Sequence, residues 1–264
     1  MTTRPVTTRP GARPQAASIA RALRDGLRAE EAFGAADAIL PVRTRPRPTL
    51  TARREAPRVT TPTPAPARND ETEALAEVAA GVAGCTRCPL CRTRTQTVFG
   101  SGSPTADLMI IGEAPGAAED RTGLPFVGRA GQLLTKMLAA IDLDRERDVY
   151  ICNVLKCRPP SNRDPEPPEI ASCLSWLKRQ IDLVAPRVIL TLGAPATRTV
   201  LDTTESISRI RGREIARYGA TVIPSFHPAY LLRNPAAKRE SWIDLKLVRK
   251  RLDEAGSRRR EDGM

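Results

Sequence analysis

The chain has 264 residues, of which 42 are Lys or Arg and 30 are Asp or Glu, giving a net charge of +12 at pH 7. This length predicts one sizeable domain with a tail, or two small domains. No apolar run reaches the roughly 18 residues of a membrane span, and no apolar export core stands near the start. We therefore expect a cytoplasmic protein without membrane association.

The positive charge is concentrated in residues 1–71, which form an Arg- and Pro-rich segment. Residues 1–69 alone hold 13 Arg against 5 Asp and Glu, together with 10 of the 24 prolines. Such a segment cannot bury enough apolar surface to offset its ordering entropy, so we expect a largely disordered tail. An alanine-rich stretch at 17–40 predicts one helix, which could dock on a protein partner. The C-terminal residues 257–264 are expected to be disordered as well.

Three short apolar runs, 107–116, 149–155 and 187–193, predict buried strands. The first and the third end in glycine, as a strand that enters a tight turn does. Between the runs, 131–143 and 168–186 have the apolar spacing of helices. Strands that alternate with helices predict an α/β fold, with a mostly parallel sheet covered on both faces.

The C-terminal part of the chain predicts shorter elements. Residues 192–201 predict a short helix, and 213–226 predict a hairpin or two further strands. Residues 238–256 have the spacing of an amphipathic helix. Its apolar stripe consists of Trp242, Leu245, Val248 and Leu252.

Polar residues follow the ends of several predicted strands. GEAPG (112–116) and Asn153 each close a strand, and SFHP (225–228) contains His227, the only histidine of the chain. In parallel sheets, ligands sit beyond the carboxyl ends of the strands, so we expect these residues to share one crevice. A lone histidine is more often a structural residue than a catalyst, and its neighbours in that crevice decide its role.

The cysteines predict a metal site rather than disulfides, because cytosolic thiols are kept reduced. The C-x2-C pair Cys85 and Cys88 presents two thiolates from one turn, which suits zinc or an iron–sulfur cluster equally. Cys157 and Cys173 flank a proline-rich loop and can converge on that pair. Cys152 lies inside an apolar strand, where we expect it to pack.

Several motifs occur in a specific order: GEAPG (112–116), RTGLPFVGRAG (121–131), NVLKCRPPSNRDPEP (153–167), Cys173 and HPAYLLRNP (227–235). Together they resemble the family 4 uracil-DNA glycosylases of bacteria and archaea, over roughly residues 72–255. The resemblance implies a three-layer α/β/α sandwich for the domain, 72–256, and hydrolytic removal of uracil from DNA.

The resemblance also implies a [4Fe–4S] cluster. Its ligands would be Cys85, Cys88, Cys157 and Cys173, while Cys91 departs from the four-cysteine pattern and could compete as a ligand. Glycosidic hydrolysis is not a redox reaction, so we expect the cluster to have a structural role, in which it holds the loop between Cys157 and Cys173 near DNA.

Two catalytic residues follow from the same resemblance. Glu113 would orient or deprotonate the attacking water and oppose the positive charge of the sugar. His227 would donate a neutral N–H to uracil O2, where negative charge develops.

The uracil pocket would be formed by four further residues. Phe126 would stack on the base, and the amide of Asn153 would pair with uracil O4 and N3–H. Glu119 would exclude the methyl group of thymine at C5, and the backbone of Ala114 would bond the base.

The remaining implied contacts are to DNA, whose phosphates also suit the basic character of the chain. One of Leu231, Leu232 and Arg233 would fill the gap left by the flipped base. The candidate phosphate contacts are Arg158, Asn162, Arg163 and Ser225.

Two other functions fit parts of the pattern. A uracil-DNA-binding branch with little turnover has GEQPG and an additional Arg- and His-containing loop. Here Ala114 stands in place of the Gln and VGRAGQLL runs on without that loop, which favours turnover. A non-enzymatic iron–sulfur nucleic-acid-binding module would not require Glu113, Asn153 and His227 together. We expect a monomer.

Overall fold

The computed structural model describes the backbone of residues 68–261 and the side chains of residues 72–254. The expected disordered tail, up to residue 67, and its helix at 17–40 lie outside these residues. The first described helix, α2 (Arg68–Ala83), begins four residues before the domain boundary expected at 72. The last helix, α9 (Lys238–Glu261), continues past the expected end at 256.

A six-stranded sheet forms the centre of the domain, with strand order β1-β3-β2-β4-β6-β5. The four central strands run parallel, and β1 and β5 pair antiparallel at the two edges. Their bounds are β1 (Ser101–Gly102), β2 (Leu108–Gly112), β3 (Val149–Asn153), β4 (Val188–Leu192), β5 (Ile215–Arg217) and β6 (Ala220–Ser225). The three strands and the hairpin expected from the sequence are thereby confirmed.

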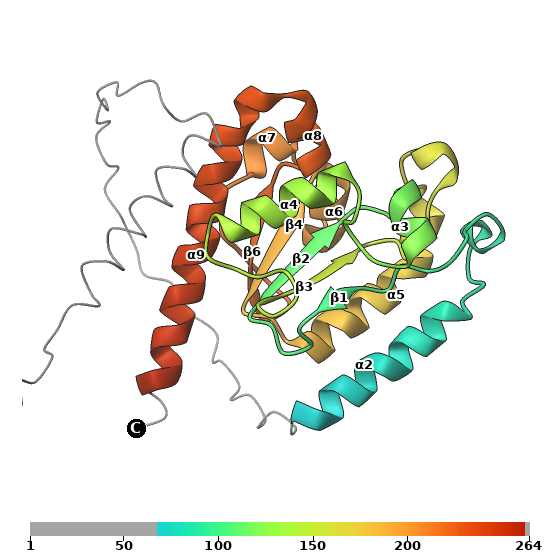
Figure 1. Cartoon of the computed structure of the whole chain (residues 1–264), viewed down its shortest axis with the longest axis horizontal. Helices are drawn as coiled ribbons and strands as arrows, with labels where there is room; N and C mark the ends of the chain where they lie inside the picture. The colour runs from blue at the N-terminus through green and yellow to red at the C-terminus, as the bar shows by residue number, and fades with distance from the viewer. Residues whose placement is uncertain (1–67, 262–264) are drawn as a thin grey trace, which may run out of the picture.

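Helices cover both faces of the sheet (Figure 1). The remaining helices are α3 (Ala117–Thr122), α4 (Arg129–Ala139), α5 (Pro167–Val184), α6 (Ala194–Leu201), α7 (Ile207–Ile210) and α8 (Pro228–Arg233). Short 3-10 turns are η1 (Pro89–Arg92), η2 (Pro160–Asn162) and η3 (Pro235–Ala237). No helix in the described part of the chain is long and apolar enough to cross a membrane.

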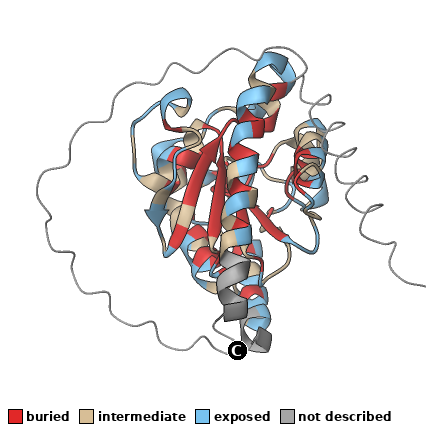
Figure 2. Cartoon of the chain, turned by 90° about the vertical axis from the view of Figure 1, so that its left-hand side faces the viewer, coloured by how far each residue is buried: buried red, intermediate tan, exposed pale blue. Residues whose placement is uncertain are grey.

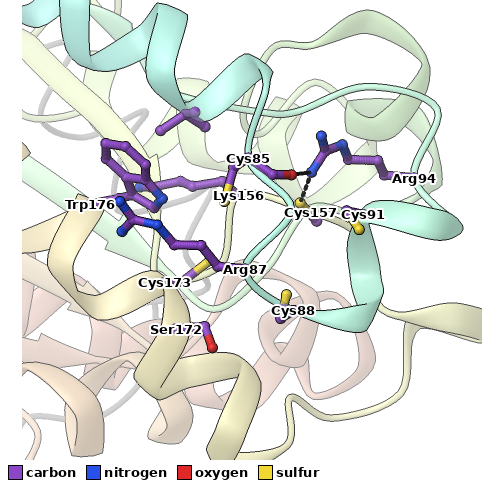
Figure 3. A pocket seen from close by; sticks show the side chains of 11 residues that line it. Cys85, Arg87, Cys88, Cys91, Arg94, Lys156, Cys157, Ser172, Cys173 and Trp176 are labelled. Carbon is purple, nitrogen blue, oxygen red and sulfur yellow. Dashed lines mark hydrogen bonds between the residues drawn. The ribbon is translucent and has the colours of Figure 1, made fainter.

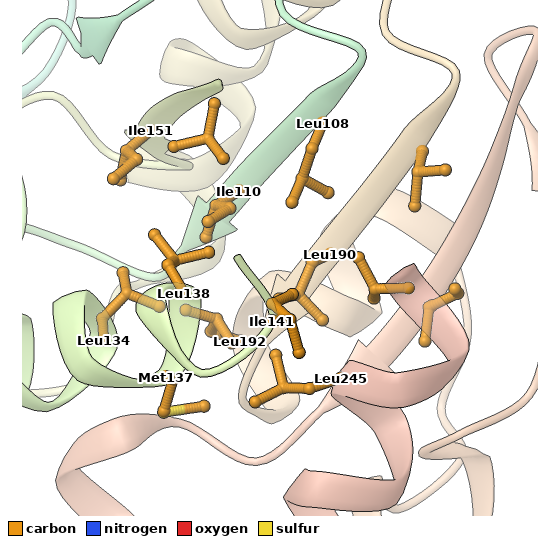
Figure 4. Close-up of a cluster of buried hydrophobic side chains, with 14 of the residues drawn as sticks. Leu108, Ile110, Leu134, Met137, Leu138, Ile141, Ile151, Leu190, Leu192 and Leu245 are labelled. Atoms are coloured by element: carbon orange, nitrogen blue, oxygen red, sulfur yellow. The ribbon is translucent and has the colours of Figure 1, made fainter. Parts of the chain in front are cut away.

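The two faces of the sheet bury two separate cores, because successive side chains of a strand point to opposite faces. In β2, Leu108 and Ile110 face the first core, whereas Met109 and Ile111 face the second. Helices α4, α8 and α9 complete the first core, part of which is drawn in Figure 4, and α2, α5 and α6 complete the second. Strands β2, β3 and β4 are buried throughout (Figure 2). The three-layer α/β/α sandwich is therefore confirmed.

Local sequence explains where the main helices begin. α5 starts at Pro167, whose fixed φ suits a first turn, and Glu166 and Glu169 form a reciprocal capping box. In α9, Trp242, Leu245 and Val248 are buried, as the apolar stripe predicts, and Leu252 is buried with them. The helices thus pack on the two faces of the sheet, and the connecting loops lie at the carboxyl ends of its parallel strands.

Candidate active site and cysteine pocket

Three loops at the carboxyl end of the sheet line one pocket. Glu113 directly follows β2, Asn153 is the last residue of β3, and His227 lies two residues beyond the end of β6. All three side chains line this pocket, together with Ala114, Glu119, Phe126, Asn162, Arg163 and Arg233. The crevice expected from the strand ends therefore exists, and it brings a carboxylate, a carboxamide and an imidazole together.

The carboxamide of Asn153 is buried, with 1% of the residue exposed. Its Oδ1 has no hydrogen-bond partner among the described residues. A buried acceptor without a partner costs free energy, and such atoms commonly mark a ligand site. The backbone carbonyl of Asn153 accepts a 2.6 Å hydrogen bond from Nζ of Lys156, so the residue itself is held firmly.

Gly112 makes room for two side chains of the pocket. A Cβ atom at this position would lie 2.4 Å from Oδ1 of Asn153 and 2.5 Å from Cζ of Phe126. The Phe126 ring and the Asn153 carboxamide therefore both pass over the bare backbone of Gly112. The ring centroids of Phe126 and His227 are 5.6 Å apart, with 31° between the ring planes.

His227 is a neutral imidazole in this environment. It caps the N-terminus of α8, and its Nδ1 accepts a 3.1 Å hydrogen bond from the backbone N–H of Ala229. The ring proton consequently resides on Nε2. Burial is the main cause that lowers the pKa of His227 to about 4; the charge of Arg233 acts in the same direction, and that of Glu119 opposes it. His227 can thus act as a neutral N–H donor, as the sequence analysis expects.

The Glu113 carboxyl is half-buried. Burial raises its pKa, and repulsion from the carboxylate of Asp164 adds to the shift. Asp164 lines the same pocket, in the loop before α5. Asp164 was not predicted as a site residue, although its place in the RDPEP motif beside Arg163 is a signal for a contact with the site.

Glu119 lines the pocket but also has a structural contact. Its Oε1 accepts hydrogen bonds of 2.9 Å from the backbone N–H groups of both Val127 and Gly128. The carboxylate therefore fixes the segment that follows Phe126.

Two of the predicted DNA contacts have buried side chains. The hydroxyl of Ser225 donates a 2.7 Å hydrogen bond to Oδ2 of Asp244, inside the fold, and is not available to a phosphate. Leu231 is fully buried in the core between α4, α8 and α9. The neighbouring Leu232 and Arg233 are exposed and remain candidates for the minor groove.

Arg158 and Arg163, the two basic residues among the predicted phosphate contacts, differ in how far their guanidinium groups are already bound within the protein. Nε of Arg158 bonds Oδ1 of Asn162 at 2.7 Å, near the pocket rim. Arg163 forms a two-pronged ion pair with the buried carboxylate of Glu169, at 2.9 and 2.7 Å. Its guanidinium is therefore largely committed to the start of α5.

A second pocket is lined by five of the six cysteines (Figure 3). They come from the loop after α2, from η1, from the loop after β3 and from α5, and they are Cys85, Cys88, Cys91, Cys157 and Cys173. All are free thiols. Cys152 is buried in the second core instead, which confirms the packing role expected for it.

The groups around this pocket can stabilise negatively charged thiolate ligands. Arg94 donates hydrogen bonds to Sγ of Cys157 at 3.2 Å and to the carbonyl of Cys85 at 2.8 Å. The side chain of Lys156 is buried and also lines this pocket. Hydrogen bonds and cations near thiolate ligands stabilise their negative charge.

No three His, Cys, Asp or Glu side chains of the described residues converge closely enough to hold a single metal ion. The residues present fit an iron–sulfur cluster, because five thiols line one pocket and the guanidinium of Arg94 lies beside one of them.

The match to known proteins decides the family. The family model of the uracil DNA glycosylase superfamily matches residues 99–246. The chain belongs to this superfamily. Within the superfamily, it is 49% identical over 164 residues to the type-4 uracil-DNA glycosylase of Thermotoga maritima, covering 61% of this chain and 85% of that protein.

Further type-4 relatives agree with this match. The type-4 uracil-DNA glycosylase of Archaeoglobus fulgidus is 44% identical over 184 residues, covering 67% of this chain and 92% of that protein. A type-5 uracil-DNA glycosylase of Pyrobaculum aerophilum is 35% identical over 148 residues, covering 49% and 64%. The resemblance inferred from the sequence motifs is thereby confirmed.

Proposed function

We propose that this uracil DNA glycosylase superfamily member hydrolyses the N-glycosidic bond of deoxyuridine in DNA, which releases uracil and leaves an abasic site for base-excision repair. The observation that carries the proposal is the convergence of Glu113, Asn153 and His227 on one pocket. Type-4 uracil-DNA glycosylases, at 40–49% identity, are the relatives that support this reaction.

Base recognition requires a flipped nucleotide, because a stacked and paired uracil cannot be reached. The Phe126 ring would stack on the base. The unpartnered Oδ1 of Asn153 would accept uracil N3–H, while its amide N–H donates to O4. Cytosine has no proton at N3 and carries a donor at position 4, so it would leave buried polar groups unpaired.

The chemistry uses the other two side chains. As the bond breaks, positive charge develops on the sugar and negative charge on the uracil ring. Glu113, as a carboxylate, would orient the attacking water and stabilise the sugar cation. Nε2–H of His227 would donate to O2, and loss of one such preorganised donor typically lowers the rate by about 10²–10³. A neutral imidazole avoids the cost of burying a charge beside the base.

DNA binding would combine phosphate contacts with a wedge. Arg158 and Asn162 would bind the backbone near the pocket, with a smaller part for the ion-paired Arg163. Leu232 or Arg233 would enter the gap left by the uracil, in place of the buried Leu231.

The cysteine pocket would hold a [4Fe–4S] cluster through Cys85, Cys88, Cys157 and Cys173, with Cys91 as a possible competing ligand. Bound there, the cluster would act as a covalent cross-link between the loops rather than as a reactant. It would join the segment after α2 to the loop that follows Asn153.

A cleavage assay tests the function. Purified protein is incubated with an oligonucleotide containing one uracil and then treated with alkali, which cuts abasic sites. We expect strand scission at the uracil and none in matched oligonucleotides with thymine or cytosine. Scission should be lost in the Glu113→Gln variant. Binding without scission by the wild type would contradict the proposal and favour a DNA-binding protein with little turnover.

A further inference from the structure

Phe126 has an unusual backbone conformation for an aromatic residue. Its φ angle is 53°, in the left-handed region that residues with a Cβ rarely adopt. The ring is nevertheless held over Gly112, beside Asn153 and His227. Strained backbone of this kind persists only where surrounding contacts enforce it. The segment 125–128, here called the Phe126 loop, should therefore have strong external restraints.

One restraint is the side chain of Arg145. Its Nη1 donates to the carbonyl of Phe126 at 2.9 Å, and its Nη2 donates to the carbonyl of Pro125 at 3.0 Å. A third hydrogen bond, 3.1 Å long, runs from Nη1 to Oγ1 of Thr135 in α4. The side chain is mostly buried, with 17% of its surface exposed. The planar guanidinium fork thus binds two successive carbonyls of the loop.

A second restraint acts from the other end of the loop. The carboxylate of Glu119 accepts hydrogen bonds from the backbone N–H groups of Val127 and Gly128. Four consecutive residues therefore have backbone groups bound by two side chains of opposite charge. The carbonyls are bound by a cation and the N–H groups by an anion, and charge-assisted hydrogen bonds are the strong class.

We propose that Arg145 is a positioning residue for uracil recognition, which sets the Phe126 ring for base stacking by fixing the carbonyls of Pro125 and Phe126. The inference rests on the proposed function of the site. Arg145 lies in the loop between α4 and β3 and does not line the uracil pocket. Its effect on the base is therefore indirect, through the backbone of the loop.

The site behind the loop is open enough for chemical rescue. Arg145, Thr135 and Phe126 line a separate surface hollow, together with Leu124 and Gln132. A guanidinium ion can therefore reach the place of the missing side chain in an Arg145→Ala variant. A role that only stabilises the fold would not predict a gain in uracil affinity on adding this ion.

The experiment measures the inhibition constant of free uracil and the single-turnover rate on a single-uracil oligonucleotide. Arg145→Met removes all three hydrogen bonds, and we expect a rise in the uracil inhibition constant of roughly tenfold or more. Affinity for abasic DNA should not change. The matched control is Arg147→Met, because Arg147 is two residues away and 80% exposed. Millimolar guanidinium should partly restore uracil affinity in Arg145→Ala and leave the wild type unaffected.

Arg145→Lys covers the case in which the Met variant does not fold. It keeps the charge and the stem but cannot bind both carbonyls with a planar fork. We expect a folded variant with reduced uracil affinity. Wild-type uracil affinity in a folded Arg145→Met, or in Arg145→Lys when the Met variant is unfolded, would overturn the inference. A wild type that neither releases nor binds uracil would overturn the proposed function as well. If the wild type is active, wild-type affinity in the Arg145 variants counts against the positioning role of Arg145 alone.

Discussion

Replacing Gly112 with Ala tests the packing of the pocket by adding a single methyl group. The new Cβ would lie 2.4 Å from Oδ1 of Asn153 and 2.5 Å from Cζ of Phe126, whereas ordinary contacts begin at 3.4 Å. Both side chains would have to retreat by about 1 Å to restore van der Waals distances. A displacement of about 1 Å in a catalytic site can lower the rate by roughly 10²-fold.

The assay for this variant is single-turnover uracil release, measured beside thermal unfolding. We expect kcat/KM to fall by about 10²-fold, with a loss of roughly 1–3 kcal/mol in stability from overpacking. Gly84→Ala is the control, because a Cβ at Gly84 meets no atom within 4 Å. A folded Gly112→Ala protein with wild-type kcat/KM would refute the arrangement of Asn153 and Phe126 described here.

Other variants test the charges of the two pockets. Glu113 must be deprotonated to act and its pKa is raised, so the acidic limb of the pH–rate profile should lie above the ordinary carboxyl range. Asp164→Asn removes a repelling charge and should move that limb to lower pH. An unchanged limb would contradict the repulsion between Asp164 and Glu113. Because the pKa of His227 is about 4 when folded and near 6.5 when unfolded, the unfolded chain binds this proton first as pH falls. The stability contributed by the neutral imidazole is therefore complete above pH 6.5 and lost between about 6.5 and 4. His227→Gln should flatten that part of the stability curve, measured by denaturant unfolding, and should slow uracil release by about 10²–10³. Cys157→Ala should lose the visible absorption of an iron–sulfur cluster, and a colourless wild type containing zinc would contradict the cluster.

Local patterns were enough to predict the framework of the site. The apolar runs identify β2, β3 and β4, and parallel strands place their carboxyl ends at one edge, which brings Glu113 and Asn153 together. The stripe of α9 follows from helical spacing alone. These features depend on residues that are close in sequence.

Sequence patterns are least informative where long-range packing decides whether a side chain is buried. Ser225 looks like a polar loop residue, but its partner Asp244 lies 19 positions away on α9. Leu231 belongs to a six-residue helix, too short for its buried face to be read from apolar spacing. Arg145 was not singled out either, because its acceptors lie 19 and 20 residues earlier in the chain.

The position of the base in a complex is the most direct measurement of the central claim. A crystal structure of the Glu113→Gln variant with a single-uracil oligonucleotide should contain an extrahelical uracil stacked on Phe126. Its N3 and O4 should bond the amide of Asn153, and its O2 should accept a hydrogen bond from Nε2 of His227. A uracil that remains in the helix, or that binds away from these three side chains, would contradict the account.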